Sequence, residues 1–173
     1  MDFKKEILKD QMLANAKRMA EHVAFHPKEI KKLVKLFSDK DNNVSMRSAW
    51  IISHVCSLTP EIVISIIPDF IKYLKSKDPN PPTIRCILSS LQQIKIPAKY
   101  CGTIFDFCIG YVKNTSMPFA VRAFSINIMG ILCKRYPELK HEIELILSEL
   151  KTHPQPGSIT ASIRNTSKIL LKL

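Results

Sequence analysis

Four arginines recur at nearly even intervals along the chain and have the chemistry to bind a charged ligand. Successive members are 38, 37 and 42 residues apart, and each directly follows an apolar residue: Arg47, Arg85, Arg122 and Arg164. A guanidinium offers a planar set of donors that matches carboxylate and phosphate oxygens. Trp50 and His54 follow Arg47 at helical spacing, so both should share its face of a helix. We therefore predict these six residues as a basic binding site.

Acid–base catalysis has no strong candidate beside these arginines. The helices expected to carry them contain no Asp or Glu, and His54 is their only histidine: 43–57, 82–95, 117–135 and 158–173. A carboxyl group is therefore missing there as a general acid or base. A lone histidine among apolar neighbours is more often a partly buried structural residue than a catalyst. We predict no enzyme activity and no cofactor. We also predict no metal site, since His22 and His26 have no third ligand.

Each arginine also has a structural alternative, in which it bonds a turn carboxylate or a helix-end carbonyl of a neighbouring repeat. Asp41 precedes Arg47 by six residues and Asp78 precedes Arg85 by seven, so these two arginines have turn carboxylates within reach. The turns before Arg122 and Arg164 contain no Asp. The structural role is favoured for the first pair, and neither role is favoured for the second.

The arginine intervals indicate a repeated pair of helices, since two-helix solenoid repeats have a period of ~40–47 residues. A proline precedes each expected first helix: Pro27, Pro60, Pro97 and Pro137. Proline suits the first turn of a helix, where its missing N–H costs nothing. Each repeat is therefore predicted as a proline-led helix, a polar turn and an arginine-bearing helix. The composition supports a helical fold. With 46% hydrophobic residues, the chain is too apolar to be disordered. With only 4 Gly, it has too few turn glycines for a sheet-rich fold.

The apolar pattern predicts two layers of helices. First helices are amphipathic, as in the i, i+3, i+4, i+7 series Ile30, Leu33, Val34 and Phe37. Arginine-bearing helices are apolar on more faces and should form the inner layer. Residues 3–25 are also helical by pattern and should cap the first repeat. We expect a single domain over residues 1–173, composed of a cap and four repeats: 1–26, 27–57, 58–96, 97–136 and 137–173.

The helical pairs, proline starts and recurring arginines resemble HEAT repeats over essentially the whole chain. That resemblance implies an all-α fold, a right-handed α–α superhelix whose second helices line a concave face. A turn Asp ahead of the arginine belongs to the family pattern, and only Asp41 and Asp78 supply it here. The resemblance thus implies a concave face that is cationic and free of carboxylates.

The run from Arg47 to His54, together with residues 120–124, is also similar to a small HEAT-like family known mainly from Bacteroidetes, whose members often carry the name adenylosuccinate lyase. Lyases of that superfamily use a serine in a flexible loop, which Ser116-Met117-Pro118 resembles. The Lys and Asn-Pro that follow in those enzymes are absent here, so we predict a helix N-cap at Ser116. HEAT-like DNA glycosylases combine a basic groove with aromatic residues and an acid; Trp50 fits that description, but no acid accompanies it.

The composition favours an anionic macromolecular partner. The net charge is +11, from 26 Lys and Arg against 15 Asp and Glu, which favours steering toward acidic proteins or phosphate backbones. The five cysteines form no C-x-x-C pair, and we predict them to be core residues in a reducing compartment. With no secretory signal or membrane-spanning run recognised, a cytoplasmic location is expected. We predict a non-enzymatic scaffold that binds an acidic protein or peptide, with nucleic-acid binding as the alternative.

Overall fold

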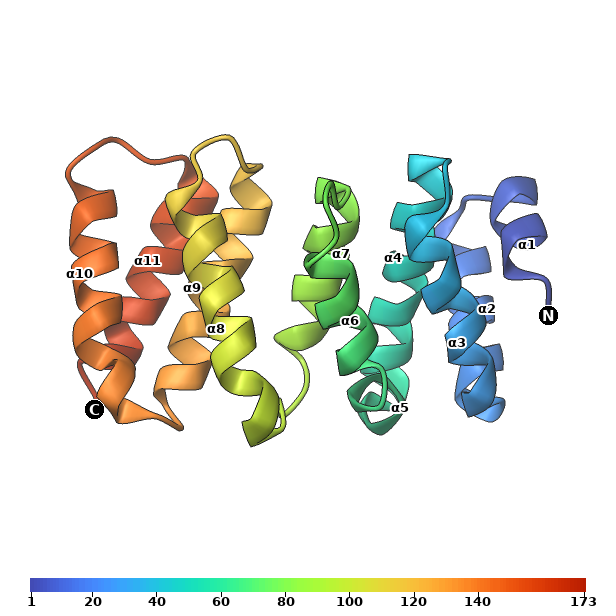
Figure 1. Cartoon of the computed structure of the whole chain (residues 1–173), viewed down its shortest axis with the longest axis horizontal. Coiled ribbons are helices and arrows are strands. Elements are labelled where there is room, and N and C mark those ends of the chain that lie inside the picture. Colours follow the sequence, from blue (N-terminus) through green and yellow to red (C-terminus); the bar gives the residue numbers. More distant parts are fainter. The chain divides into compact units, whose positions relative to one another are not determined.

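The computed structural model describes residues 1–173 and is entirely helical, which confirms the predicted all-α fold. Eleven α-helices and three short 3₁₀ helices succeed one another without a strand (Figure 1). The chain divides into two compact units, residues 1–97 and residues 98–173. None of the helices combines the length and the apolar character needed to cross a bilayer.

The N-terminal unit consists of seven α-helices in two layers. They are α1 (Phe3–Lys9), α2 (Leu13–Phe25), α3 (Ile30–Lys35), α4 (Asn42–Leu58), α5 (Pro60–Ile64), α6 (Ile67–Leu74) and α7 (Pro81–Leu91). Helix α4 is central, because it packs against α2 on one side and α7 on the other. Helices α3 and α6 form part of the layer nearer the viewer in Figure 1. The second helices α4 and α7 are thus the arginine-bearing helices that the repeat predicted.

Buried hydroxyl groups join α4 to α7. The side chains of Ser45 and Thr83, which are 38 residues apart like the first two arginines, share a hydrogen bond of 2.8 Å. The Ser45 hydroxyl also lies 2.6 Å from the Phe37 carbonyl oxygen. Both side chains are fully buried, so these bonds satisfy polar groups that would otherwise lower stability.

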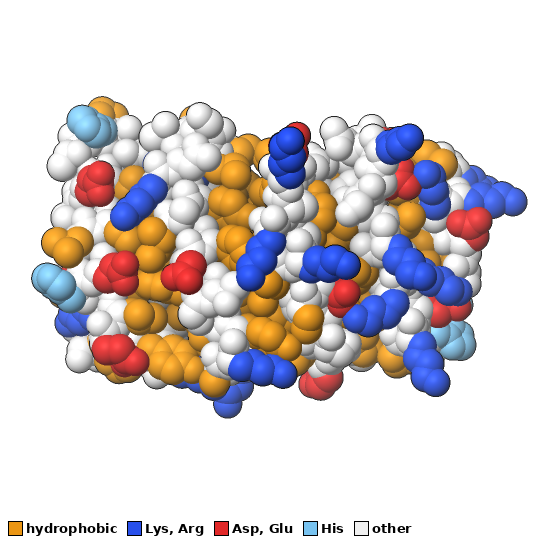
Figure 2. All heavy atoms as spheres, viewed as in Figure 1, with side chains coloured by type: hydrophobic (Ala, Val, Ile, Leu, Met, Phe, Trp, Pro, Cys, Tyr) orange, Lys and Arg blue, Asp and Glu red, His pale blue; other side chains and the backbone are white.

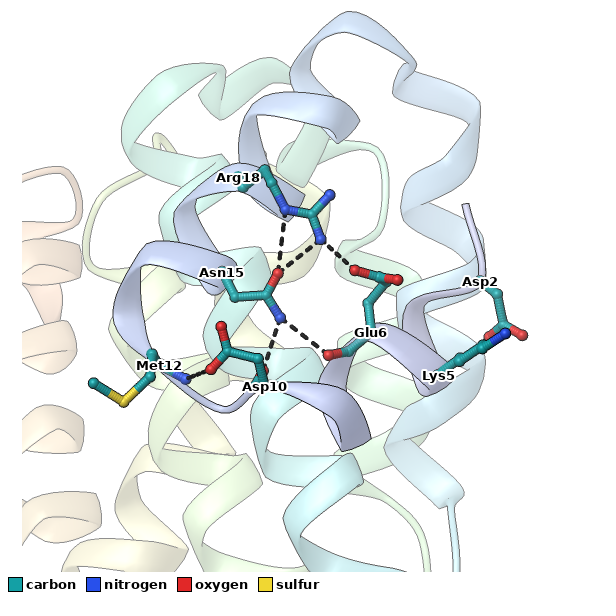
Figure 3. Close-up of polar contacts among 7 residues, drawn as sticks. All are labelled: Asp2, Lys5, Glu6, Asp10, Met12, Asn15 and Arg18. Atoms are coloured by element: carbon teal, nitrogen blue, oxygen red, sulfur yellow. Dashed lines mark hydrogen bonds and ion pairs between the residues drawn. The ribbon is translucent and has the colours of Figure 1, made fainter.

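The helical stretch predicted over residues 3–25 is two helices, so the N-terminal segment is itself a helical pair. Helix α1 ends before Asp10, whose carboxylate accepts a hydrogen bond from the Met12 N–H at 2.8 Å. The buried amide of Asn15 donates to the Glu6 and Asp10 carbonyls at 3.0 and 2.7 Å (Figure 3). The Asp10 carbonyl lies beyond the end of α1, and the Glu6 carbonyl, which also accepts the Asp10 N–H, belongs to its last turn, so Asn15 fixes α2 against the end of α1.

The first helix of the second predicted repeat is divided into α5 and α6. Pro68 is the reason, because it lacks the N–H that would bond to the Ile64 carbonyl, and its ring clashes there. The interruption places Ile66, Ile67 and Phe70 in the core with almost no exposed surface.

The C-terminal unit contains four α-helices: α8 (Ala98–Lys113), α9 (Phe119–Cys133), α10 (Lys140–Lys151) and α11 (Gly157–Leu170). Helix α9 is central and packs against α8 and α11. The approach of α11 is close at Gly130, where an added Cβ would lie 3.0 Å from two side-chain atoms of Thr166. Thr166 also donates a hydrogen bond of 3.2 Å to the Ile126 carbonyl. The absence of a side chain at Gly130 therefore allows α9 and α11 to pack this closely.

The predicted proline positions and the buried cysteines agree with the structure. Pro60 occupies the first turn of α5, and Pro97 immediately precedes α8. Pro27 and Pro137 open the 3₁₀ helices Pro27–Glu29 and Pro137–Leu139 that lead into α3 and α10. The five cysteines are unpaired and buried, as predicted, and burial raises the pKa of Cys56 to about 11 and that of Cys108 to about 12.

Candidate functional site

Arg47, Trp50 and His54 lie together on α4, as the spacing predicted. The guanidinium carbon of Arg47 is 5.0 Å from the centre of the Trp50 ring, within cation–π range. The rings of Trp50 and His54 meet edge to face with centroids 5.1 Å apart. All three side chains are half-buried. They form a mixed basic and aromatic strip along one face of the helix.

Arg47 is anchored by a backbone carbonyl and not by Asp41. Its Nη1 donates to the Gln11 carbonyl at 2.8 Å, in the turn between α1 and α2. The Asp41 carboxylate instead accepts the Asn43 N–H at 2.8 Å and caps α4. The expected Asp41–Arg47 contact is therefore absent, although a helix-end carbonyl takes its place.

Arg85 extends the basic strip onto α7 and is exposed. It makes no ion pair with Asp78, and its Nη2 lies 3.8 Å from the Cys86 sulfur. Burial raises the pKa of the Cys86 thiol, while the charges of Arg85 and Arg47 both act against that rise. Arg85 and Arg47 therefore both act on this thiol, and they come from α7 and α4, which pack against each other.

His54 lies in a partly buried position that favours its neutral form. Burial lowers the pKa of its imidazole, and the nearby positive charge of Lys17 on α2 lowers it further. Its Nε2 atom is buried without a hydrogen-bond partner. Lys17 was not among the predicted site residues, because nothing in the repeat pattern places α2 beside α4. We call Lys17, Arg47, Trp50, His54 and Arg85 the α2–α4–α7 face.

Arg122 has a different position from the other predicted arginines, because it is buried, with a relative exposure of 6%. Its Nε donates to the Val112 carbonyl at 3.1 Å, near the end of α8. A cavity of about 310 Å³ beside it is lined in part by Lys113, His153 and Glu149. The surroundings of Arg122 are therefore not free of carboxylates, although α9 itself carries none.

Arg164 lies on α11 and lines a groove of about 520 Å³. The other basic or titratable side chains in this groove are Lys151, His153 and Lys168, and no carboxylate lines it. Neither Arg164 nor Lys168 forms an ion pair, and both are exposed. The spacing of Arg164 and Lys168 by one helical turn was visible in the sequence, whereas Lys151 comes from the preceding helix. We call these four residues the α11 groove.

Carboxylates are absent from the second helices and lie mainly on the first helices and in turns. The four arginine-bearing helices contain no Asp or Glu, and Glu21 is the one carboxylate on α2. Acidic residues of the C-terminal unit concentrate on or just before α10: Glu138, Glu142, Glu144 and Glu149. Figure 2 shows acidic side chains over α8 and α10, and mostly basic ones over α3 and α6.

Ser116 lies in an exposed turn and does not cap a helix. Helix α9 begins at Phe119 with Pro118 in the N-cap position, and the Ser116 N–H donates to the Asn114 side chain at 3.0 Å. The predicted N-cap at Ser116 is therefore wrong, because Pro118 separates this serine from the helix.

A family model described as a HEAT repeat domain matches residues 3–170. No curated protein and no solved structure matches the chain.

Proposed function

Because the chain belongs to the HEAT-repeat family, we propose that it is a non-enzymatic binding protein whose basic second-helix surfaces hold an acidic protein partner. The observation that carries this proposal is that α4, α7, α9 and α11 bear arginines and no carboxylate. An acidic segment that lies on any one of these helices therefore meets cations without repulsion from carboxylates of that helix. Repeat proteins of this kind offer extended surfaces for such contacts.

The four arginines divide into two roles under this proposal. Arg47 and Arg122 bond carbonyls in neighbouring turns or helix ends, and they fix the helices in place. Arg85 and Arg164 are exposed and make no ion pair, so their guanidiniums are available to carboxylates of a partner. Each unit therefore contributes one anchoring arginine and one exposed arginine.

The proposal is tested by measuring binding of a fluorescent decaglutamate peptide by anisotropy, with decalysine and a short DNA duplex as competing probes. The double variant R85E/R164E should weaken decaglutamate binding by at least about tenfold, because charge reversal replaces attraction by repulsion. The matched control K28E/K35E makes the same change in net charge at exposed residues of the first-helix layer. It should change the affinity by less than about twofold.

Two outcomes contradict the proposal. Equal losses in both double variants would show that net charge alone governs binding. Tight binding of the duplex, with a logarithmic salt slope of roughly 0.9 per phosphate contact and no binding of decaglutamate, would assign the surface to nucleic acid.

A further inference from the structure

The α2–α4–α7 face has an apolar edge that the basic residues alone do not explain. Met12 and Leu13, at the start of α2, are 71% and 46% exposed. Met12 lines the same narrow crevice as Arg47 and Trp50. Leu13 precedes Lys17 by one helical turn, and Lys17 is close to His54. Apolar and basic side chains therefore lie side by side on one surface of the N-terminal unit.

The Arg47–Trp50 pair in the middle of this surface is held in place before any partner arrives. The Gln11 carbonyl fixes one end of the guanidinium, and the Trp50 ring lies 5.0 Å from its carbon. Side chains that are already ordered lose little conformational entropy on binding. Arginine and tryptophan are also the residue types that most often dominate binding energy at interfaces.

The charge of this surface selects the partner. Lys17 and Arg85 are exposed and belong to none of the ion pairs of the structure, and Arg47 contacts an uncharged carbonyl and a ring. Two carboxylates accompany these cations: Glu21 on α2, and Asp10, which lines the crevice from the turn before α2 and accepts the Met12 N–H at 2.8 Å. The lowered pKa of His54 leaves that residue neutral near pH 7, so cations remain in excess. An acidic segment therefore complements the cations, but a segment with acids alone leaves the Met12–Leu13–Trp50 edge exposed to water.

We infer that the α2–α4–α7 face takes an acidic peptide that also carries an apolar side chain, seated on Met12, Leu13 and Trp50 beside the anchored Arg47, with carboxylates on the exposed Lys17 and Arg85. This inference rests on the proposed function and names the class of segment that the face selects. The apolar anchor supplies affinity through burial, and the flanking carboxylates supply orientation.

The test compares two synthetic acidic peptides that differ only in one central residue, Leu or Ser. The Leu peptide should bind about tenfold more tightly, which is the effect of burying one large aliphatic side chain. The variant M12S/L13S changes exposed residues and should remove this preference, so that it binds the Leu and Ser peptides with equal affinity. Leu145→Ser is the control, because Leu145 is 57% exposed on α10 of the other unit. It should retain the full preference.

The outcomes separate the two proposals. Equal affinities for the Leu and Ser peptides would overturn the apolar anchor and leave the proposed function standing. Absence of binding by both peptides would overturn the proposed function as well. Equal weakening of both peptides by M12S/L13S would also refute the anchor, since the effect would then not depend on the central side chain.

Discussion

The guanidinium of Arg122 donates its Nε hydrogen to the Val112 carbonyl at 3.1 Å, and this bond joins α9 to the C-terminal end of α8. Val112 is among the last residues of α8, where carbonyls have no helical N–H to accept. The buried guanidinium therefore supplies a donor to a free carbonyl at the end of α8. The exposed Arg164 has no such role.

Replacing Arg122 by Met should lower the free energy of unfolding by about 1–3 kcal/mol, because a buried carbonyl loses its donor while the apolar stem is kept. Urea unfolding followed by circular dichroism measures the change. Arg164→Met serves as the comparison and should stay within about 0.5 kcal/mol of the parent protein. Similar losses at the two positions would contradict the assignment of separate roles.

Gly130→Ala should destabilise the protein despite the gain in helix propensity. The added Cβ meets Thr166 at 3.0 Å, and Thr166 is held by its hydrogen bond to Ile126. Overpacking costs about 1–3 kcal/mol, whereas the propensity gain is about 1 kcal/mol. Gly102→Ala and Gly110→Ala are matched controls on α8, since nothing lies within 4 Å of an added Cβ there. Thermal unfolding should show the controls stabilised and Gly130→Ala destabilised.

Asn15→Ala should loosen the N-terminal helical pair. Its amide donates to the Glu6 and Asp10 carbonyls, and its removal leaves both without this donor. The expected loss is about 1–3 kcal/mol in the free energy of unfolding. Hydrogen exchange should also show faster exchange of α1 amides than in the parent protein. Asn165→Ala, at an exposed position of α11, should change neither quantity.

The folded protein should lose stability below neutral pH in part through His54. Burial and Lys17 lower the pKa of this imidazole from its usual 6.5, so the unfolded chain binds a proton that the folded chain resists. The free energy of unfolding should therefore fall as the pH drops through 6.5 toward the lower folded-state pKa. Urea unfolding across this range should show a shallower fall in His54→Gln. Lys17→Met should also flatten the dependence, and a slope equal to that of the parent in both variants would argue against this origin.

Much of the fold was predictable because backbone chemistry controls it locally. The arginine-bearing helices were predicted from position 43 and from position 158, and they begin at Asn42 and Gly157. Proline is favoured in the first turn of a helix, and Pro60 lies there in α5. The end of α7 at Leu91, four residues before the predicted end, was not evident, since the next residues have no strong helix-breaking type until Pro97.

The candidate site was less predictable because it depends on the rotation of helices about their axes. Arg85 and Arg122 each follow a β-branched apolar residue, Ile84 and Val121, yet one arginine is exposed and the other is buried against a carbonyl. Asp41 was expected near Arg47, but its short side chain reaches the nearest free N–H of its own helix first. Lys17 belongs to the surface through tertiary packing alone.

Glu138, Glu142, Glu144 and Glu149 all lie on or just before α10. The charge of the C-terminal unit is therefore distributed asymmetrically, with a negative side at α10. Arg164 and Lys168 on α11 lie outside that acidic segment. A negatively charged chain approaching through water is turned by the electric field of such a distribution before any atoms touch. Encounter should therefore be both faster and better oriented in dilute buffer, and dissolved salt should erase this advantage without altering the final fit.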